Sequence, residues 1–424
     1  MKFLILYLLI VEYHLINILK IVFLELSFLS LIKNIHLFNI LIFPSWFPSK
    51  ENPLDAIFTK KHVDLISRKN KVAVAFAVES NLLNGIYEIK SEENGNYPIY
   101  TCYYRTSRCN LYLYKKIVNF YRKLNAYVKA FKCAMKHLKH VDFIHIHVIG
   151  FEAIIPLFYK IFKKIPYYIT EHSTIYLRCN SVWSFENMFK RFIVKESLGI
   201  SAVSNALRDG MRKLRIDHRF FFVIPNIVDE LKFQYKQKQK GEIFRFLHIS
   251  RLDEKAKNTI GILRVFDKIF EQNKNIELHI VGGFPNVISE SELYSKKLKS
   301  KSNIFFHGVK FNDDIIAYYQ KVDVFVMFSN YETQGVVVME ALFCGLPVIT
   351  TNLLCFKEYL HQGNSIMIDP KDEISLQKVM ELVIKQEVEF WTPENIVIDI
   401  KEKFASQKIE NSFMEFYKIG LSKC

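Results

Sequence analysis

The sequence predicts an α/β protein with two domains, each built on a doubly wound, mostly parallel β-sheet. The chain has 424 residues, which is too long for one ordinary domain. Short, continuously apolar runs alternate with longer stretches of helical periodicity, as they do where helices cover both faces of a parallel sheet. A polar, charged segment at 229–242 divides these runs into two series.

Each series contains six predicted strands, which suits two Rossmann-like domains with a ligand cleft between the carboxyl ends of their strands. The predicted strands are 39–43, 71–78, 142–147, 166–170, 199–203 and 220–224, followed by 244–249, 276–281, 303–306, 322–327, 346–350 and 365–368. We divide the chain into an N-terminal domain at 36–228, a linker at 229–242, a C-terminal domain at 243–395 and a C-terminal helix at 396–424.

Composition limits the classes of protein. Half of the residues are apolar, which excludes a disordered chain. The 58 Lys and Arg residues outnumber the 43 Asp and Glu residues, and a net charge of +15 favours an anionic partner such as a phosphate ligand, a membrane surface or nucleic acid. The seven cysteines contain no C-x-x-C pair, which argues against a disulfide framework or a zinc site and for the reducing cytoplasm.

The first 35 residues form a hydrophobic leader that Glu12, Lys20 and Glu25 interrupt. Its longest uncharged stretch is too short to cross a bilayer about 30 Å thick. Three interpretations stay open: an interfacial membrane anchor, an ordered helix packed on the body of the protein, and a start-site artefact.

Two glutamates flank a predicted loop-to-helix junction in the C-terminal domain. Glu332 lies in the loop after strand 322–327, and Glu340 lies in the helix that opens at Gly335. Free N–H groups at the start of this helix form a ready anion site. The two carboxylates can accept hydrogen bonds from sugar or ribose hydroxyls; alternatively, they are a loop carboxylate and a solvated helix residue.

Two cations open the C-terminal domain beside the same cleft. Arg251 follows strand 244–249, and Lys257 precedes a helix predicted at 259–272. A fixed Arg and Lys can neutralise a diphosphate leaving group. Because the chain lacks the Asp-x-Asp pair that commonly holds a metal-bound diphosphate, we expect no metal ion and no other cofactor. The alternative is a solvated basic turn; Lys255 is the less favoured lysine because it lies in mid-loop.

Eight segments, in the same order along 39–417, resemble the retaining glycosyltransferases of family 4, which have the GT-B fold. They begin with ILIFPSWFPSKENPLDAIF and end with YETQGVVVMEALFCGLPVI. The resemblance implies two Rossmann-like domains facing across a cleft and a C-terminal helix that returns to the N-terminal domain. It also implies a nucleotide-diphospho-sugar donor, held mainly by the C-terminal domain, whose sugar keeps its anomeric configuration on transfer.

The resemblance also implies roles for the cleft residues. Arg251 and Lys257 contact the diphosphate, Glu340 the ribose hydroxyls, Glu332 the donor sugar, and His147 lies near the reacting centre. The remaining donor-binding residues that it implies are Gln334, Gly335, Val336, Gly282, Val309 and Lys310. The acceptor proton goes to a leaving phosphate oxygen, so the reaction requires no protein nucleophile.

Histidines follow two strands of the N-terminal domain. His145 and His147 share one face of strand 142–147, and only its carboxyl end, at His147, reaches the cleft. Glu171 and His172 follow the next strand, where they can line the acceptor side. A buried core histidine is the alternative for His147, and capping of the following segment is the alternative for Glu171 and His172.

The loop 44–58, which shapes the acceptor side in the family, carries Trp46. A glycine is usual near position 56, where this chain has Ala56. Because a positive φ is disfavoured for alanine, we expect this loop to make no direct phosphate contact. The Gly282-Gly283 turn also departs from the commoner Gly-x-Gly.

The stretch 94–141 contains ten Lys and Arg residues, no Asp or Glu, and interleaved tyrosines. Residues 115–139 read as one long amphipathic helix, and such basic helices bind anionic membranes. We expect a peripheral membrane contact through 105–139; a solvated helix face is the alternative. No recognised nucleic-acid module is present, so we expect no nucleic-acid partner.

The first hypothesis is a bacterial, metal-independent glycosyltransferase. It moves a hexose-type sugar to a saccharide or lipid-linked acceptor in polysaccharide or lipopolysaccharide synthesis, at the cytoplasmic face of the membrane. A sugar-nucleotide 2-epimerase and a non-catalytic GT-B scaffold are the alternatives. The paired cations and glutamates favour transfer.

Overall fold

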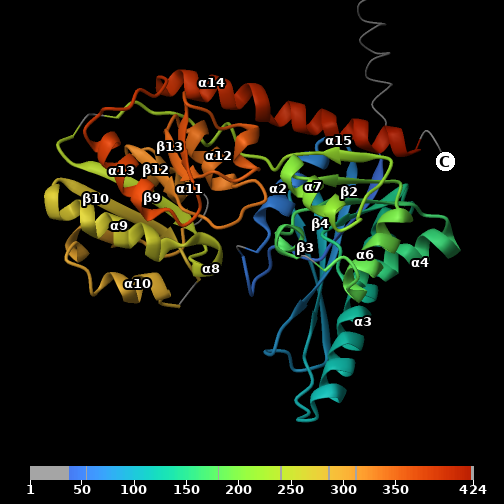
Figure 1. The fold of residues 1–424 in the computed structure, drawn as a ribbon. Helices are drawn as coiled ribbons and strands as arrows, with labels where there is room; N and C mark the ends of the chain where they lie inside the picture. The colour runs from blue at the N-terminus through green and yellow to red at the C-terminus, as the bar shows by residue number, and fades with distance from the viewer. Residues whose placement is uncertain are drawn as a thin grey trace, which may run out of the picture.

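The computed structural model describes residues 38–421 except 54, 180, 239–240, 285–286 and 311–312. It contains two α/β domains, with a pair of C-terminal helices running along both (Figure 1). The hydrophobic leader and its three interpretations lie outside the described residues.

The N-terminal domain is built on an eight-stranded sheet of order β3-β4-β2-β1-β5-β6-β7-β8. All neighbours are parallel except the edge pair β3–β4. The central strands are buried along their length because they consist of continuous apolar runs. The strands are β1 (Asn39–Pro44), β2 (Lys71–Glu79), β3 (Tyr87–Asn94), β4 (Tyr97–Tyr104), β5 (Phe143–His147), β6 (Tyr167–Glu171), β7 (Gly199–Ala202) and β8 (Phe221–Val223).

The prediction of six strands for this domain was wrong, because it missed the hairpin of β3 and β4. The register pairs Asn94 with Tyr97, so a two-residue turn joins the strands, and Gly95 has a φ of +61°. Asn-Gly-Asn between two runs of alternating residues is a signal for such a turn. The hairpin was therefore detectable in the sequence.

The C-terminal domain has the six parallel strands that were predicted, in the order β11-β10-β9-β12-β13-β14. In chain order, the first three strands lie progressively further from the centre of the sheet on one side, and the next three do so on the other side, as in a Rossmann fold. The order reverses between β9 and β12, and the loops after these two strands carry Arg251 and Glu332. The strands are β9 (Phe244–Ser250), β10 (Ile276–Gly282), β11 (Ile304–Phe306), β12 (Val324–Met327), β13 (Val348–Thr351) and β14 (Ser365–Ile368).

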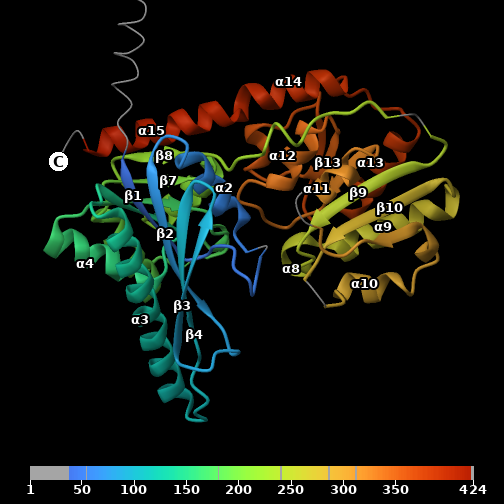
Figure 2. The same cartoon turned by 180° about the vertical axis from the view of Figure 1, so that it is seen from behind.

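Helices connect and cover the strands in both domains. The long helix α3 packs against β1, β2 and β4 and extends beside the hairpin (Figures 1 and 2). The helices before the C-terminal pair are α2 (Ile57–Ile66), α3 (Tyr112–Leu138), α4 (Ile154–Lys163), α5 (Ile175–Arg178), α6 (Phe185–Lys195), α7 (Asn205–Lys213), α8 (Glu254–Lys257), α9 (Thr259–Gln272), α10 (Glu290–Ser295), α11 (Asp313–Tyr319), α12 (Val336–Phe343) and α13 (Glu373–Ile384). Among the described residues, none of these helices combines the length and apolarity needed to cross a membrane.

The chain ends in two helices instead of the single one that was predicted. Helix α14 (Pro393–Phe404) and helix α15 (Ser406–Leu421) are separated at Ala405, whose ψ of 135° breaks the helical path. Ile396 and Ile400 of α14 join the core of the C-terminal domain, whereas Phe413 and Tyr417 of α15 join the core of the N-terminal domain. The predicted return of the chain to the N-terminal domain is thus confirmed, and Figure 2 shows the two helices spanning both domains.

Candidate active site

A hollow of about 360 Å³ lies between the two domains and brings together five of the predicted site residues. We call it the interdomain hollow. Trp46 and His172 line it from the N-terminal domain, and Arg251, Lys257 and Glu332 line it from the C-terminal domain. The loops after β1, β6, β9 and β12 supply four of these residues, and the short helix after β9 ends in Lys257, because the carboxyl ends of both sheets face this space.

The two predicted cations of the hollow are each paired with a carboxylate. Lys257 Nζ forms an ion pair with Glu332 inside the C-terminal domain. Arg251 reaches across the domain boundary, with its Nη2 atom 3.0 Å from Asp55 Oδ1. Lys255 is exposed and does not line the hollow, in keeping with its mid-loop position.

Glu340 lies buried on α12 and does not line the interdomain hollow. Its Oε2 atom accepts a hydrogen bond of 3.0 Å from the Tyr319 hydroxyl. Its Oε1 atom lies 3.2 Å from Lys61 Nζ, which belongs to α2 of the N-terminal domain. One carboxylate oxygen is therefore held from within the domain and the other from across the boundary.

Helix α12 begins at Val336 after Gly335, whose φ is +75°. A side chain at Gly335 would place its Cβ atom 2.4 Å from Phe356 Cε1, so this turn requires glycine. Gln334 turns its side chain toward the N-terminal domain, where Oε1 accepts a hydrogen bond of 2.8 Å from the Asn226 N–H. The N–H groups of Val336 and Val337 precede the first bond of the helix, which Val338 N–H donates to the Gly335 carbonyl oxygen, and such groups can bind an anion.

His147 is fully buried at the end of β5, behind His172, and does not line the hollow. Its Nδ1 atom lies 3.3 Å from His172 Nε2. Burial lowers the pKa of both imidazoles well below the usual value, with the neighbouring histidines adding to the effect, so both rings are neutral at pH 7. His145 is a core residue, bonded to Thr170 and to the Tyr417 hydroxyl.

Glu171 points into the protein and away from the hollow, contrary to the prediction that it lines the acceptor side. Its Oε1 atom accepts hydrogen bonds from the Ile149 N–H at 2.8 Å and the Tyr176 hydroxyl at 2.6 Å. Burial raises the pKa of this carboxyl. Glu171 therefore ties together the loops after β5 and β6, which is close to the capping role considered as its alternative.

Ala56 adopts the positive φ that was expected to be disfavoured. It has φ +47° and ψ +42°, and it caps the N-terminus of α2 beside the hollow. The left-handed conformation costs an alanine about 1–2 kcal/mol. The loop thus accepts this strain and keeps the helix N-terminus facing the space between the domains.

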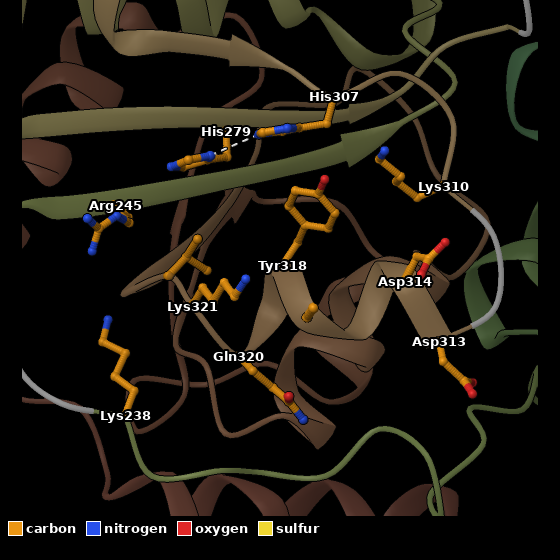
Figure 3. A pocket seen from close by; sticks show the side chains of 12 residues that line it. Lys238, Arg245, His279, His307, Lys310, Asp313, Asp314, Tyr318, Gln320 and Lys321 are labelled. Atoms are coloured by element: carbon orange, nitrogen blue, oxygen red, sulfur yellow. Dashed lines mark hydrogen bonds between the residues drawn. The ribbon is translucent and has the colours of Figure 1, made fainter.

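Three of the predicted donor-binding residues, Gly282, Val309 and Lys310, lie outside the interdomain hollow. Gly282 has a φ of +123°, and a Cβ atom there would lie 1.8 Å from the Ser250 carbonyl oxygen. Lys310 lines a separate hollow of about 900 Å³ beside α11, together with His279, His307 and Tyr318 (Figure 3). Val309 precedes Lys310 in the loop after β11 and lines neither hollow.

Two residues that the sequence analysis missed hold the predicted ones in place. Asp55 pairs with Arg251, and Lys61 pairs with Glu340, each across the domain boundary. They lie 196 and 279 positions from their partners, so no local pattern reveals them.

Comparison with known proteins identifies the family. A model described as "Glycosyl transferases group 1" matches residues 229–399, and one described as "Glycosyltransferase Family 4" matches residues 92–230. The N-acetyl-alpha-D-glucosaminyl L-malate synthase of Bacillus anthracis is 24% identical over 293 residues, which cover 66% of this chain and 75% of that one. The alpha-monoglucosyldiacylglycerol synthase of Acholeplasma laidlawii is 24% identical over 278 residues, or 59% of this chain and 69% of that one.

A solved structure confirms the GT-B fold. The crystal structure of Anabaena HepE in complex with UDP and glucose has a TM-score of 0.65 and 16% identity, over 90% of this chain and 100% of that one. The chain is related to sugar transferases of polysaccharide and glycolipid synthesis. It is an enzyme, and it belongs to the group 1 glycosyltransferases of family 4.

Proposed function

We propose that the enzyme is a metal-independent, retaining glycosyltransferase. It moves a hexose-type sugar from a nucleotide-diphospho-sugar to a saccharide or lipid-linked acceptor in cell-surface polysaccharide or lipopolysaccharide synthesis. The convergence of Arg251, Lys257 and Glu332 with His172 and Trp46 on one hollow supports this proposal. The UDP and glucose bound to HepE, which has the same fold, favour a UDP-sugar as donor.

The ion pairs of the hollow indicate where the donor binds. A diphosphate replaces Asp55 on Arg251 and bridges to Lys257, and the first turn of α12 adds N–H groups. Glu332, released by Lys257, accepts hydrogen bonds from sugar hydroxyls. Glu340 keeps its bond to Tyr319 and exchanges Lys61 for a ribose hydroxyl.

The transfer step needs no protein nucleophile. The bond between the anomeric carbon and the diphosphate oxygen breaks, and its electron pair leaves with the diphosphate. The acceptor oxygen bonds to the same face of that carbon and passes its proton to a leaving phosphate oxygen. Arg251 and Lys257 stabilise the negative charge that develops, which is the role of fixed cations in such transition states.

A thermal-shift panel of UDP-, GDP-, ADP- and CMP-sugars tests the donor site. A ligand that binds only the folded state raises the melting temperature of the protein. We expect one nucleotide class to stabilise the wild type and the surface control Glu389→Ala, but not Glu340→Ala. An effect that survives in Glu340→Ala, or no effect of any nucleotide, argues against this site. An assay in EDTA tests metal independence, and we expect transfer to persist. The anomeric configuration of the product tests retention, and we expect it to match that of the donor.

The N-terminal domain carries a surface suited to an anionic membrane at the cytoplasmic face, which brings a lipid-linked acceptor to the hollow. Large apolar side chains of α3, α4 and α6 are exposed, and Phe151 joins them through ring contacts with Phe120 and Phe185. Lysines 115, 116, 163, 164 and 195 are exposed on the same helices. Such mixed surfaces lie in membrane interfaces. The proposed contact is thus wider than 105–139.

Co-sedimentation with vesicles tests this surface. We expect binding to phosphatidylglycerol vesicles and loss of binding in the double variant Ile117→Ser with Phe158→Ser. Ile374→Ser is a matched control, because Ile374 is 83% exposed on the C-terminal domain. Equal binding by the double variant, or none by the wild type, contradicts the membrane contact.

A further inference from the structure

Three histidines from different elements surround a small space behind the interdomain hollow. His62 comes from α2, His147 from the end of β5, and His172 from the residue after β6. We call them the three-histidine cluster. Their ring centroids lie 5.2 to 5.9 Å apart, and one ring nitrogen from each lies within 4.8 Å of the other two. All three side chains are buried.

Two nitrogens of the cluster have unmet hydrogen-bonding capacity. Among the described residues, His62 Nδ1 and His147 Nε2 are buried without any partner. Buried polar atoms in native proteins are nearly always bonded to protein, water or an ion, so each exception calls for an explanation. His62 Nδ1 is such an exception beside the nitrogens of two further rings, which points to an occupant.

The outer contacts of His62 and His172 orient these two rings as metal ligands are oriented. His62 Nε2 donates to the Pro225 carbonyl oxygen at 2.9 Å, which leaves a lone pair on Nδ1. His172 Nδ1 donates to Asn226 Oδ1 at 3.1 Å, which leaves a lone pair on Nε2. Histidines that bind metals almost always donate their other N–H to a carbonyl or carboxylate in this way.

The spacing between two of the rings fits a tetrahedral ion. His147 Nδ1 and His172 Nε2 are 3.3 Å apart, within hydrogen-bond distance, so an ion bound by both takes the place of the proton between them. Two imidazoles bound at about 2.0–2.1 Å to a tetrahedral zinc ion have the same separation. A ring nitrogen of His62 lies within 4.8 Å of a nitrogen of each other ring, so the His62 ring moves toward them to complete the set.

We propose that the three-histidine cluster binds one divalent transition-metal ion of the zinc type. Imidazole nitrogens suit Zn²⁺, Ni²⁺ and Cu²⁺, whereas Mg²⁺ and Ca²⁺ prefer oxygen ligands. The ion enters past His172, the one member that lines the interdomain hollow. A water molecule fills the fourth position.

The bound ion inhibits the enzyme, a consequence that rests on the proposed function. It holds His172, the member of the cluster that lines the hollow, so this ring is not available to the sugar beside Arg251 and Lys257. Asn226 also donates its N–H to Gln334 Oε1 before α12, which links the support of the cluster to the C-terminal domain. The ion therefore acts as a regulator and has no part in the transfer step.

Calorimetric titration of EDTA-treated, full-length protein with Zn²⁺ tests the site without an activity assay. We expect one ion per chain for the wild type and at least ~100-fold weaker binding for His62→Leu, because even loss of an outer partner weakens metal sites 10- to 100-fold. His307→Gln is the matched control, since it disrupts the His279–His307 pair of the other hollow. Its binding should equal that of the wild type. His62→Gln, which retains a donor for Pro225, replaces His62→Leu if that variant does not fold.

Three outcomes overturn the metal site. They are no Zn²⁺ binding by the wild type, binding by both His62 variants as tight as that of the wild type, and loss of binding in His307→Gln alone. The first means that the cluster holds only water. Inhibition is measured separately, and Zn²⁺ should slow the wild type but not His62→Leu. If no glycosyl transfer is detected, the proposed function fails while the binding result still stands.

Discussion

Arg251 of the interdomain hollow is held by a partner that the proposed diphosphate ligand can displace. Arg251 and Asp55 are half-exposed, and such ion pairs contribute at most about 1 kcal/mol. Asp55 therefore keeps the guanidinium in place without competing strongly with a diphosphate. At this scale, the sequence indicated the charged residues of the C-terminal half of the site, but the partners Asp55 and Lys61 came only from the fold.

Lys257→Ala should lower kcat by on the order of 100-fold, because a cation that stabilises the departing diphosphate acts in the transition state. Lys255→Ala is the matched control, since Lys255 is exposed outside the hollow, and its kcat should stay at the wild-type value. Steady-state assays of both variants measure the difference. Unchanged turnover in Lys257→Ala would remove this lysine from the mechanism.

His248 makes the stability of the protein depend on pH. It is buried in β9, where Nδ1 donates to the Val326 carbonyl at 2.9 Å, and burial lowers its pKa from 6.5 to about 4. Between these values the unfolded chain binds a proton that the folded chain excludes, so stability falls as the pH drops below 6.5. At pH 5 the loss is about 2 kcal/mol.

Urea unfolding of the wild type and His248→Gln at pH 7.5 and pH 5 measures this effect. We expect the stability difference between the two proteins to shrink by about 2 kcal/mol at the lower pH, because only the wild type carries the titrating group. A difference that stays constant between the two pH values would contradict the assignment.

Among the elements, helix α2 matters most to the space between the domains. It follows the N-cap residue Ala56 and supplies both Lys61, which reaches Glu340, and His62 of the three-histidine cluster. The sequence indicated that a glycine is missing at position 56. The fold adopts the left-handed conformation regardless, since the packing of α2 outweighs the local preference.

Ala56→Gly should raise the free energy of unfolding by about 0.5 kcal/mol. The substitution removes a left-handed strain of about 1–2 kcal/mol and adds about 0.5–1 kcal/mol of backbone entropy lost on folding. Chemical denaturation of the two proteins measures the gain. A substantial loss of stability would show that the alanine methyl group packs favourably enough to offset the strain.

In the whole molecule, the C-terminal helix pair links the two domains. Helix α14 packs on the C-terminal domain, and α15 contributes Phe413 and Tyr417 to the core of the N-terminal domain. The Tyr417 hydroxyl bonds to His145 Nδ1 at 2.8 Å, across 272 positions of the sequence. The position of one domain against the other thus depends in part on the last residues of the chain.

Tyr417→Phe should destabilise the N-terminal domain by about 1–3 kcal/mol, because it leaves a buried nitrogen of His145 without a partner. Tyr114→Phe, at an exposed position of α3, is the control and should have no effect. Thermal unfolding of both variants measures the change. Equal melting temperatures would mean that water or a ring movement satisfies His145.

The sequence by itself determined the class of fold, most of the strands and the segments that carry the charged candidate residues of the C-terminal domain. These features are local patterns, which can be recognised in one sequence without a structure. They are the continuous apolar runs and the two segments that carry Arg251 with Lys257 and Glu332 with Glu340. The break at Ala405 left no comparable signal. The tertiary structure alone decided that Glu171 turns inward, that Asp55 and Lys61 reach across the boundary, and that three histidines meet. Those contacts join residues far apart in the sequence, and only the packing of one sheet and helix against another brings them within bonding distance.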